Sequence, residues 1–291
     1  MKRVAAIDIG TNSTRLLVAD YSGAGLKRIE TGLITTRLGK GMSSGLLLQE
    51  TMLSTADAVG LFYRKAINLG AESVVAATTS AVRDAANRTE FLELVKKRTG
   101  LTVRVLGGEE EAALSYRGVL SGLQVEPDST VVVDIGGGST EFIWMHGEQL
   151  NLVSVNAGAV RLTDTAADEI VIYNILRPTL EEVKQSAFEC LVGVGGTVTT
   201  LAAIDQQLAV YDPKRVHGYS LSAASVNRIL KMLNSMDMEE RRKVPGLRPE
   251  RADIIVAGAN IVKIIMDGLG SEKMLVSECD ILDGLALEEC C

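Results

Sequence analysis

Apolar and polar positions in the first half of the chain form two kinds of pattern. Short apolar runs predict strands at Arg3–Ile9, Thr14–Ala19, Leu26–Thr36, Ser73–Ala77 and Thr102–Leu106. Apolar residues that recur every three or four positions predict helices at Leu48–Leu69, Thr89–Arg98 and Glu109–Leu120. Strands and helices interleaved in this order are typical of an α/β layered fold.

After a turn-rich stretch at Ser121–Ser129, the second half continues the mixture. Its predicted strands are Gln149–Val155, Leu191–Val194 and Met274–Val276. Its predicted helices are Val160–Glu169, Thr179–Glu189, one that begins at Val198, Ala223–Leu233, Pro249–Met266 and Leu282–Glu289. We therefore expect domains at residues 1–122 and 123–278, with a C-terminal helix, about 279–291, that can pack back on the first.

One polar turn occurs twice. Asp8–Thr14 is echoed by Asp134–Thr140, with Asp, Ile, Gly, Ser and Thr in the same relative places, and an apolar strand precedes and follows each copy. Each copy has a carboxylate at the bend of a strand–turn–strand hairpin. The repeat predicts two halves of similar fold that face each other across a cleft.

The first turn has the chemistry of a phosphate site. Gly10 allows a tight bend near a ligand, and the backbone N–H groups with Thr11, Asn12 and Ser13 can donate to phosphate oxygens. Asp8 could hold a hydrated magnesium ion opposite that phosphate. An ordinary hairpin with turn-forming polar residues is the competing interpretation.

The second turn is the sharper signal. Asp134 and Glu141 bracket it, and this spacing suits shared ligation of Mg²⁺. Successive glycines weaken a strand bend unless something must approach the backbone. The candidate phosphate-binding residues of this turn are Gly136, Gly137, Gly138, Ser139 and Thr140.

Three further segments carry candidate residues. Gly195, Gly196 and Thr197 join a strand to a helix start, which is either an anion site or a tight packing turn. In Glu109–Glu111, crowded like charges can raise the pKa of one carboxyl and suit it to act as a general base, although capping also explains acids in a first helical turn. Further candidate donors to phosphate are Arg15, Thr79, Ser80 and Arg83. Each of them can equally be an ordinary solvated residue or turn residue.

Composition narrows the classes of function. The net charge is −7 and aromatic residues make up 4%, which disfavours nucleic-acid binding. No signal peptide or membrane span is expected, which favours the cytoplasm. With two histidines in the chain, acid–base chemistry is expected to rest on carboxylates. The cysteines, including Cys290 and Cys291, form no zinc pattern and are expected to be reduced.

Together these motifs resemble the exopolyphosphatase / guanosine pentaphosphate phosphatase family, in its short two-domain form, within the actin-like ATPase superfamily. The resemblance covers nearly the whole chain and includes the segments 36–41, 79–87, 108–112, 157–162, 194–197 and 216–218. It implies an α/β fold of two ribonuclease H-like domains. It also implies that Glu111 is the general base and that Asp134 and Glu141 bind Mg²⁺. The end of the chain, Val276–Gly284, departs from the family's glycine-rich signature.

The resemblance implies an exopolyphosphatase that releases terminal phosphate by magnesium-assisted attack of a glutamate-activated water. A 5′-phosphohydrolase of pppGpp is the close alternative, and an ATP-dependent kinase or ATPase of the same superfamily is a more distant one. A nucleotide-sensing protein without turnover is the non-enzymatic alternative. The expected partner is polyphosphate or a guanosine polyphosphate, and a homodimer is left open.

Overall fold

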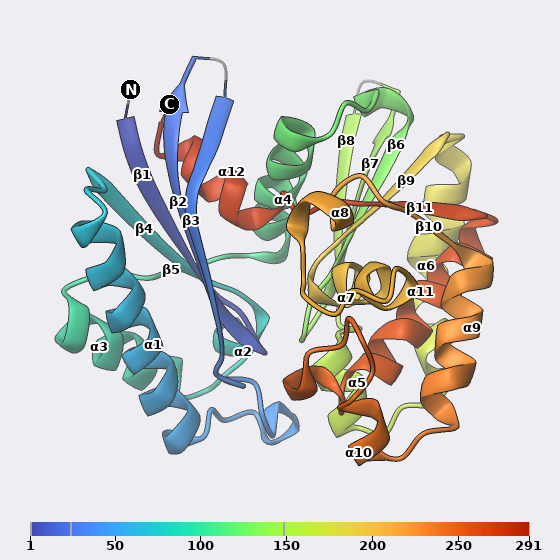
Figure 1. Cartoon of the computed structure of the whole chain (residues 1–291), viewed down its shortest axis with the longest axis horizontal. Coiled ribbons are helices and arrows are strands. Elements are labelled where there is room, and N and C mark those ends of the chain that lie inside the picture. Colours follow the sequence, from blue (N-terminus) through green and yellow to red (C-terminus); the bar gives the residue numbers. More distant parts are fainter. Residues whose placement is uncertain (1, 24, 148, 291) are drawn as a thin grey trace. The chain divides into compact units, whose positions relative to one another are not determined.

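The computed structural model describes residues 2–23, 25–147 and 149–290. Cys291, the last residue of the predicted C-terminal helix, therefore lies outside the described residues. The chain divides into two compact units (Figure 1). Unit 1 contains the residues up to Ser121 and those from Asp280 onward, and unit 2 runs from Gly122 to Cys279. The chain thus returns to unit 1 at its C-terminal end.

Unit 1 is built on a five-stranded sheet with the order β3-β2-β1-β4-β5. The strands are β1 (Lys2–Ile9), β2 (Ser13–Ser22), β3 (Gly25–Thr35), β4 (Ser73–Thr78) and β5 (Arg104–Val105). The first three are antiparallel to one another, whereas β4 is parallel to β1 and β5 to β4. The carboxyl ends of β1, β4 and β5 therefore lie along one edge.

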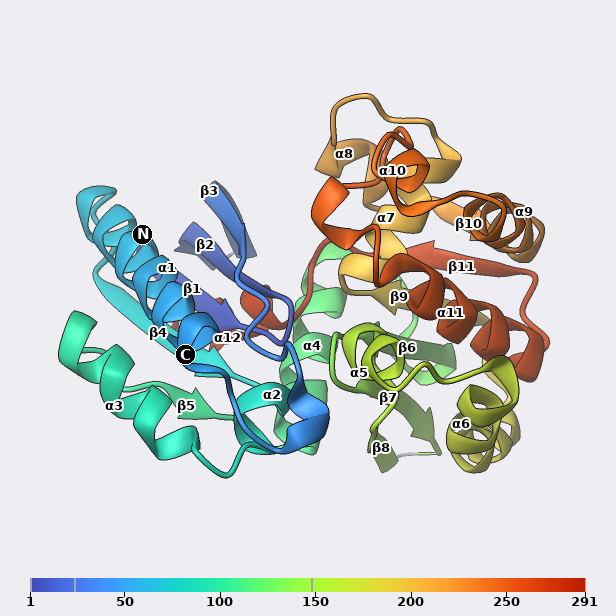
Figure 2. The ribbon, with the colours of Figure 1, turned by 90° about the horizontal axis from the view of Figure 1, so that it is seen from below.

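Helices cover both faces of this sheet (Figure 2). On one face, α1 (Gln49–Asn68) and α3 (Arg88–Thr99) pack on alternate residues of β1 and β2. On the other, α12 (Ile281–Glu288) and α4 (Gly108–Gly122) pack on the intervening residues. Alternate side chains of a strand point to opposite faces, so burial of both faces explains the nearly continuous apolar runs.

Two glycines bring the backbones of α4 and α12 into contact. A Cβ on Gly118 would collide with the carbonyl of Asp280, and one on Gly284 would collide with the carbonyl of Leu114. The N-terminal end of α12 is thereby held at a fixed place on unit 1.

Unit 2 repeats the same plan. Its six-stranded sheet has the order β10-β11-β9-β6-β7-β8. The strands are β6 (Thr130–Ile135), β7 (Thr140–His146), β8 (Gln149–Val155), β9 (Cys190–Val194), β10 (Ser220–Ser222) and β11 (Lys273–Val276). Strands β6, β7, β8, β9 and β11 have the directions of β1 to β5, and β10 adds an antiparallel edge. Both units are ribonuclease H-like, which confirms the fold that the family resemblance implies, and their common plan matches the two similar halves predicted from the repeated turn.

The helices of unit 2 cover the same kind of sheet (Figure 1). They are α5 (Ala159–Asp164), α6 (Glu169–Val183), α7 (Gly196–Asp205), α8 (Pro213–Val216), α9 (Ala223–Asn234), α10 (Met238–Arg241) and α11 (Ile255–Leu269). Among the residues that the structure describes, no helix is both long and apolar enough to cross a membrane.

Three helix predictions in unit 2 are wrong at their boundaries. The predicted helix Val160–Glu169 ends at Asp164, and α6 begins at Glu169, where the Asp168 side chain caps it by accepting from Val171 N at 2.9 Å. The predicted helix Thr179–Glu189 begins ten residues too late, because α6 runs from Glu169 to Val183 and continues through Pro178. The predicted helix Pro249–Met266 is a 3₁₀ turn at Pro249–Arg251 followed by α11.

The shortest elements escaped prediction or were predicted too long. Helices α8 and α10 and strand β10 span three or four residues each, too few for a periodic pattern. Strand β5 covers two residues of the predicted Thr102–Leu106, and α7 starts two residues before Val198. The early start of α7 places Gly196 and Thr197 in its first turn.

Candidate functional site

The turn between β1 and β2 is held by its own backbone and by a neighbouring loop. Gly10 N donates to Ser13 O at 3.0 Å, and a Cβ on Gly10 would lie 3.1 Å from that oxygen. Backbone N–H groups of residues 36–39 donate to the carbonyls of Thr11 and Asn12 at 2.8–3.1 Å. The loop is therefore rigid on the side of residues 36–39, as a phosphate-binding turn must be.

The end of β4 lies beside this turn. Thr78 Oγ1 donates to Ile9 O at 2.9 Å, and the hydroxyls of Thr11 and Ser80 are 3.0 Å apart in a buried contact. Ser80 begins α2 (Ser80–Arg83), which follows β4 directly. Ligands of open α/β sheets bind at the carboxyl ends of parallel strands, and this is where Thr11 and Ser80 meet.

Glu111 lies in the first turn of α4, after β5 ends at the same edge. Its side chain is buried, and Arg83 Nη1 donates to Glu111 Oε2 at 3.0 Å and to Leu106 O at 3.2 Å. The neighbouring Glu110 is exposed and pairs with Arg104 at 2.6 Å. The charge nearest to Glu111 in these contacts is thus a guanidinium, which replaces the predicted crowding of carboxylates.

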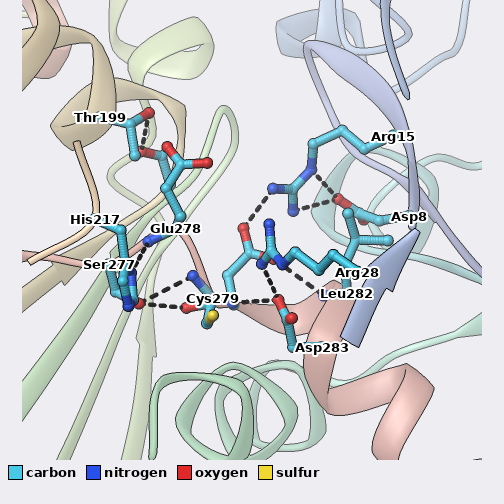
Figure 3. Close-up of polar contacts among 12 residues, drawn as sticks. Asp8, Arg15, Arg28, Thr199, His217, Ser277, Glu278, Cys279, Leu282 and Asp283 are labelled. Carbon is cyan, nitrogen blue, oxygen red and sulfur yellow. Dashed lines mark hydrogen bonds and ion pairs between the residues drawn. The ribbon is translucent and has the colours of Figure 1, made fainter. Parts of the chain in front are cut away.

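Asp8 and Arg15 face each other across β1 and β2 and form an ion pair (Figure 3). Arg15 Nε and Nη2 both donate to Asp8 Oδ2, at 2.9 and 2.7 Å, and Arg15 Nη1 donates to Asp280. Burial raises the pKa of the Asp8 carboxyl above its ordinary value, while the Arg15 guanidinium opposes this rise. Arg15, which was predicted as a candidate donor to phosphate, makes three donor contacts in this structure, and all of them go to the carboxylates of Asp8 and Asp280.

The turn between β6 and β7 has the same core geometry. Gly136 N donates to Ser139 O at 3.0 Å, and a Cβ on Gly136 would lie 3.1 Å from that oxygen, as in the first turn. Here α5 provides the support, since its first N–H groups donate to the carbonyls of Gly136 and Gly137 at 2.8–3.0 Å. Arg161 Nε donates to Gly138 O at 2.7 Å.

Asp134 and Glu141 are direct cross-strand partners at the base of this turn. Residues paired in this way project from the same face of the sheet. Glu141 is buried, and Ser154 Oγ donates to its Oε1 at 2.7 Å. Asp134 lies beside Gly195, because a Cβ on Gly195 would be 3.0 Å from Asp134 Oδ1.

This carboxylate pair fits a magnesium ion that keeps most of its water. Within residues 2–23, 25–147 and 149–290, no group of three or more His, Cys, Asp or Glu side chains is arranged to enclose a metal. Mg²⁺ commonly takes one or two carboxylates and retains several waters, so a pair of acids matches its ligand preference.

The third glycine turn leads into α7. Gly195 has φ 91°, a backbone conformation that favours glycine, and Thr197 Oγ1 is buried with no hydrogen-bond partner among the described residues. The Arg251 guanidinium lies against Gly196, where a Cβ would collide with it. The structure thus places Asp134, Gly195 and Arg251 around the first turn of α7.

Sequence reasoning did not identify several of these neighbours. Arg251 and Asp280 lie far along the chain from the turns they reach, and no local pattern marks them. Residues 36–39 and 157–161 were noted in the family resemblance, but not as supports of the two turns. The glycines of these segments were the available sequence signal, because Gly39 packs tightly against Thr11 and Gly158 against Gly137.

Two ribonuclease H-like units, each with a polar turn between its first two strands, define a protein of the actin-like ATPase fold. A model described as the Ppx/GppA phosphatase family matches residues 17–290. The chain belongs to this family, and it is a hydrolase that acts on phosphoric anhydrides.

Relatives in sequence and in structure agree with this assignment. The chain is 35% identical to Exopolyphosphatase 2 of Mycobacterium tuberculosis, over 99% of this chain and 98% of that protein. The crystal structure of an Aquifex aeolicus Ppx/GppA family member has a TM-score of 0.82 at 32% identity, over 99% and 97% of the two chains. An exopolyphosphatase from Cytophaga hutchinsonii has a TM-score of 0.90 at 26% identity, with the same coverage.

Proposed function

We propose that this protein is an exopolyphosphatase in which Glu111 activates the attacking water. The observation that carries the proposal is the buried Glu111 carboxylate, held by Arg83 at the edge where β1, β4 and β5 end. A general base must be fixed near its target and shielded from competing water. The similarity to proteins named exopolyphosphatase supports polyphosphate as the substrate.

The residues of unit 1 suggest how substrate binding could activate Glu111. In this structure Arg83 is the counter-ion of Glu111, and its Nη1 donates to Glu111 Oε2. A phosphate bound near Thr11 and Ser80 would offer oxygens that compete for the Arg83 donors. Glu111 would then be free to accept a proton from water as that water attacks the terminal phosphorus. The anhydride P–O bond breaks, and the shortened chain leaves with the bridging oxygen.

Asp134 and Glu141 would hold magnesium in this proposal. The bound ion would neutralise charge on the phosphate oxygens. The turn residues Gly136 to Thr140 would donate backbone and hydroxyl groups to the same phosphates, with α5 keeping the turn rigid. Thr197 Oγ1 and the first turn of α7 would provide a further anion contact.

Replacement of Glu111 by Gln tests the proposal. We expect Glu111→Gln to lower phosphate release from polyphosphate by about 100-fold or more, while binding of polyphosphate changes little, because the amide cannot accept the proton. Glu110→Gln is the matched control, since Glu110 is the exposed neighbour paired with Arg104. Near-normal turnover by Glu111→Gln would remove it from this role.

The substrate is tested in the same assay. Phosphate release is measured with polyphosphates of several lengths, pppGpp and ATP, each with and without magnesium. We expect the highest kcat/KM with polyphosphate and dependence on magnesium. A preference for pppGpp would establish the alternative substrate, and transfer from ATP to an acceptor hydroxyl would contradict hydrolysis.

A further inference from the structure

Arg15 links two buried carboxylates that come from opposite ends of the chain (Figure 3). Asp8 is the last residue but one of β1, just before the turn to β2, and Asp280 is the N-cap residue of α12. The side chain of Asp8 is 6% exposed and that of Asp280 is 7% exposed. Two buried acids around one guanidinium leave a net negative charge, which is costly unless a further cation is nearby.

The two oxygens of Asp8 have different surroundings. Both contacts from Arg15 go to Oδ2, whereas Oδ1 is buried and accepts no hydrogen bond from the residues that the structure describes. Arginine and carboxylate often pair with two donors on two oxygens, and this pair does not. An anionic oxygen without a protein donor suits a hydrated magnesium ion or its water.

Asp280 accepts from the Arg15 nitrogen that does not contact Asp8. Arg15 Nη1 donates to Asp280 Oδ2, while Asp280 Oδ1 accepts from Leu282 N at 3.0 Å as the helix cap. The close contact of Gly118 with the Asp280 carbonyl fixes the backbone at this point. Asp280 therefore draws Arg15 Nη1 away from Asp8.

We propose that Asp280 is a positioning residue for Asp8, which it serves by holding Arg15 on Oδ2 so that Oδ1 stays available to a hydrated divalent cation. Without the charge of Asp280, Arg15 has one carboxylate left as its partner and can turn both arms of its fork onto the two oxygens of Asp8. That pairing withdraws Oδ1 and weakens cation binding. The inference rests on the proposed function and adds to it a contact between Asp8 and a hydrated divalent cation.

Asp280→Asn separates this role from helix capping. Asparagine caps helices about as well as aspartate, so α12 keeps its cap while the charge is lost. Asp283→Asn is the matched control because it makes the same change three residues later in the same helix. Asp283 accepts from Arg28 at 2.6 Å and from Asp280 N at 3.1 Å, and none of its hydrogen bonds involves Arg15.

The measurement is binding of Mn²⁺ to the whole protein without substrate, followed by the EPR signal of the free ion. We expect Asp280→Asn to weaken binding roughly tenfold, as loss of an outer-shell partner commonly does, and Asp283→Asn to leave it within about twofold. In an Arg15→Gln background, Asp280→Asn should have no further effect, because the linking group is gone. Thermal unfolding of each variant reports any loss of fold.

The results distinguish this inference from the proposed function. Unchanged Mn²⁺ binding in a folded Asp280→Asn protein, or equal effects of the two Asn variants, would overturn the role of Asp280 even if polyphosphate is hydrolysed. If the Asp280→Asn protein does not fold, the test uses the Arg15→Gln protein instead. Unchanged Mn²⁺ binding by Arg15→Gln would also overturn the role of Asp280. Failure of the wild-type protein to release phosphate would instead contradict the proposed function.

Discussion

The two units contain the same turn with opposite charges across it. In unit 1, Asp8 is paired across the strands with Arg15, and in unit 2, Asp134 is paired with Glu141 at the corresponding position. The turns themselves match, with a 3.0 Å hydrogen bond closing each. The same backbone turn therefore carries an acid opposite a cation in one unit and two opposed acids in the other.

This difference indicates a division of labour. The acid pair of unit 2 concentrates negative charge on one face of a sheet, as a cation site needs. In unit 1 the guanidinium pairs with Asp8 through Oδ2 and leaves Oδ1 without a donor among the described residues. In the proposed function, the charge of the residue opposite the aspartate, rather than the shape of the turn, separates the roles of the two turns.

The largest effect is expected from neutralising the acid pair. Glu141→Gln keeps the acceptor for Ser154 Oγ but removes the charge, so magnesium-dependent phosphate release should fall by about 100-fold. Ser154→Ala is the control, because it removes the hydrogen bond and keeps the charge, and its effect should be several-fold smaller. Equal rates for Glu141→Gln and wild type across a magnesium series would abolish the distinction between the units.

The supports of the two turns can be compared next. A Cβ at position 158 would collide with the backbone of Gly137 and Gly138, whereas one at position 39 collides chiefly with the Thr11 side chain. Gly158→Ala should therefore destabilise the protein by about 2–3 kcal/mol, and Gly39→Ala by about 1 kcal/mol, the value of the Thr11–Ser80 hydrogen bond lost when Thr11 rotates. Denaturant unfolding measures both, and the reverse order would show that the turn of unit 2 is the more adaptable one.

A pH dependence of stability is expected at the second ion pair of unit 1. Burial raises the pKa of Asp283 to about 6 from 3.8, with Asp280 adding to the rise and Arg28 opposing it. The folded state thus keeps the Asp283 proton to higher pH than the unfolded state. The stability contributed by this proton is present below pH 4 and is lost between about pH 4 and pH 6.

Asp283→Asn should remove this slope. The stability of wild type relative to Asp283→Asn is expected to fall by at most about 3 kcal/mol as the pH rises from 4 to 7. Thermal unfolding of both proteins across this range measures the difference. A constant difference would mean that Arg28 keeps Asp283 ionised throughout this pH range.

Much of the fold could be predicted because its signals are local. The alternation of apolar residues marked the central strands of both sheets, and the repeated Asp–Ile–Gly turn indicated that the halves share a fold. Errors arose where local signals conflict with packing. The predicted helix began at Thr179, but α6 already includes Pro178 and the residues before it, and its buried Leu176 and Leu180 pack into the core of unit 2.

The candidate site was predictable in its residue types and less so in its pairings. Glu111 was singled out from a triplet, yet its burial against Arg83 depends on α2 and α4 meeting at one edge of the sheet. Asp280 was not predicted, because its partner Arg15 is a neighbour in space alone.

By itself the sequence determined the order of strands and helices, the duplicated turn and the acids that flank it, since hydrophobic periodicity and glycine conformation act over a few residues. Tertiary structure decided which charge meets which, because an ion pair depends on distance in space, and the return of α12 to unit 1 brings Asp280 to Arg15 from the far end of the chain.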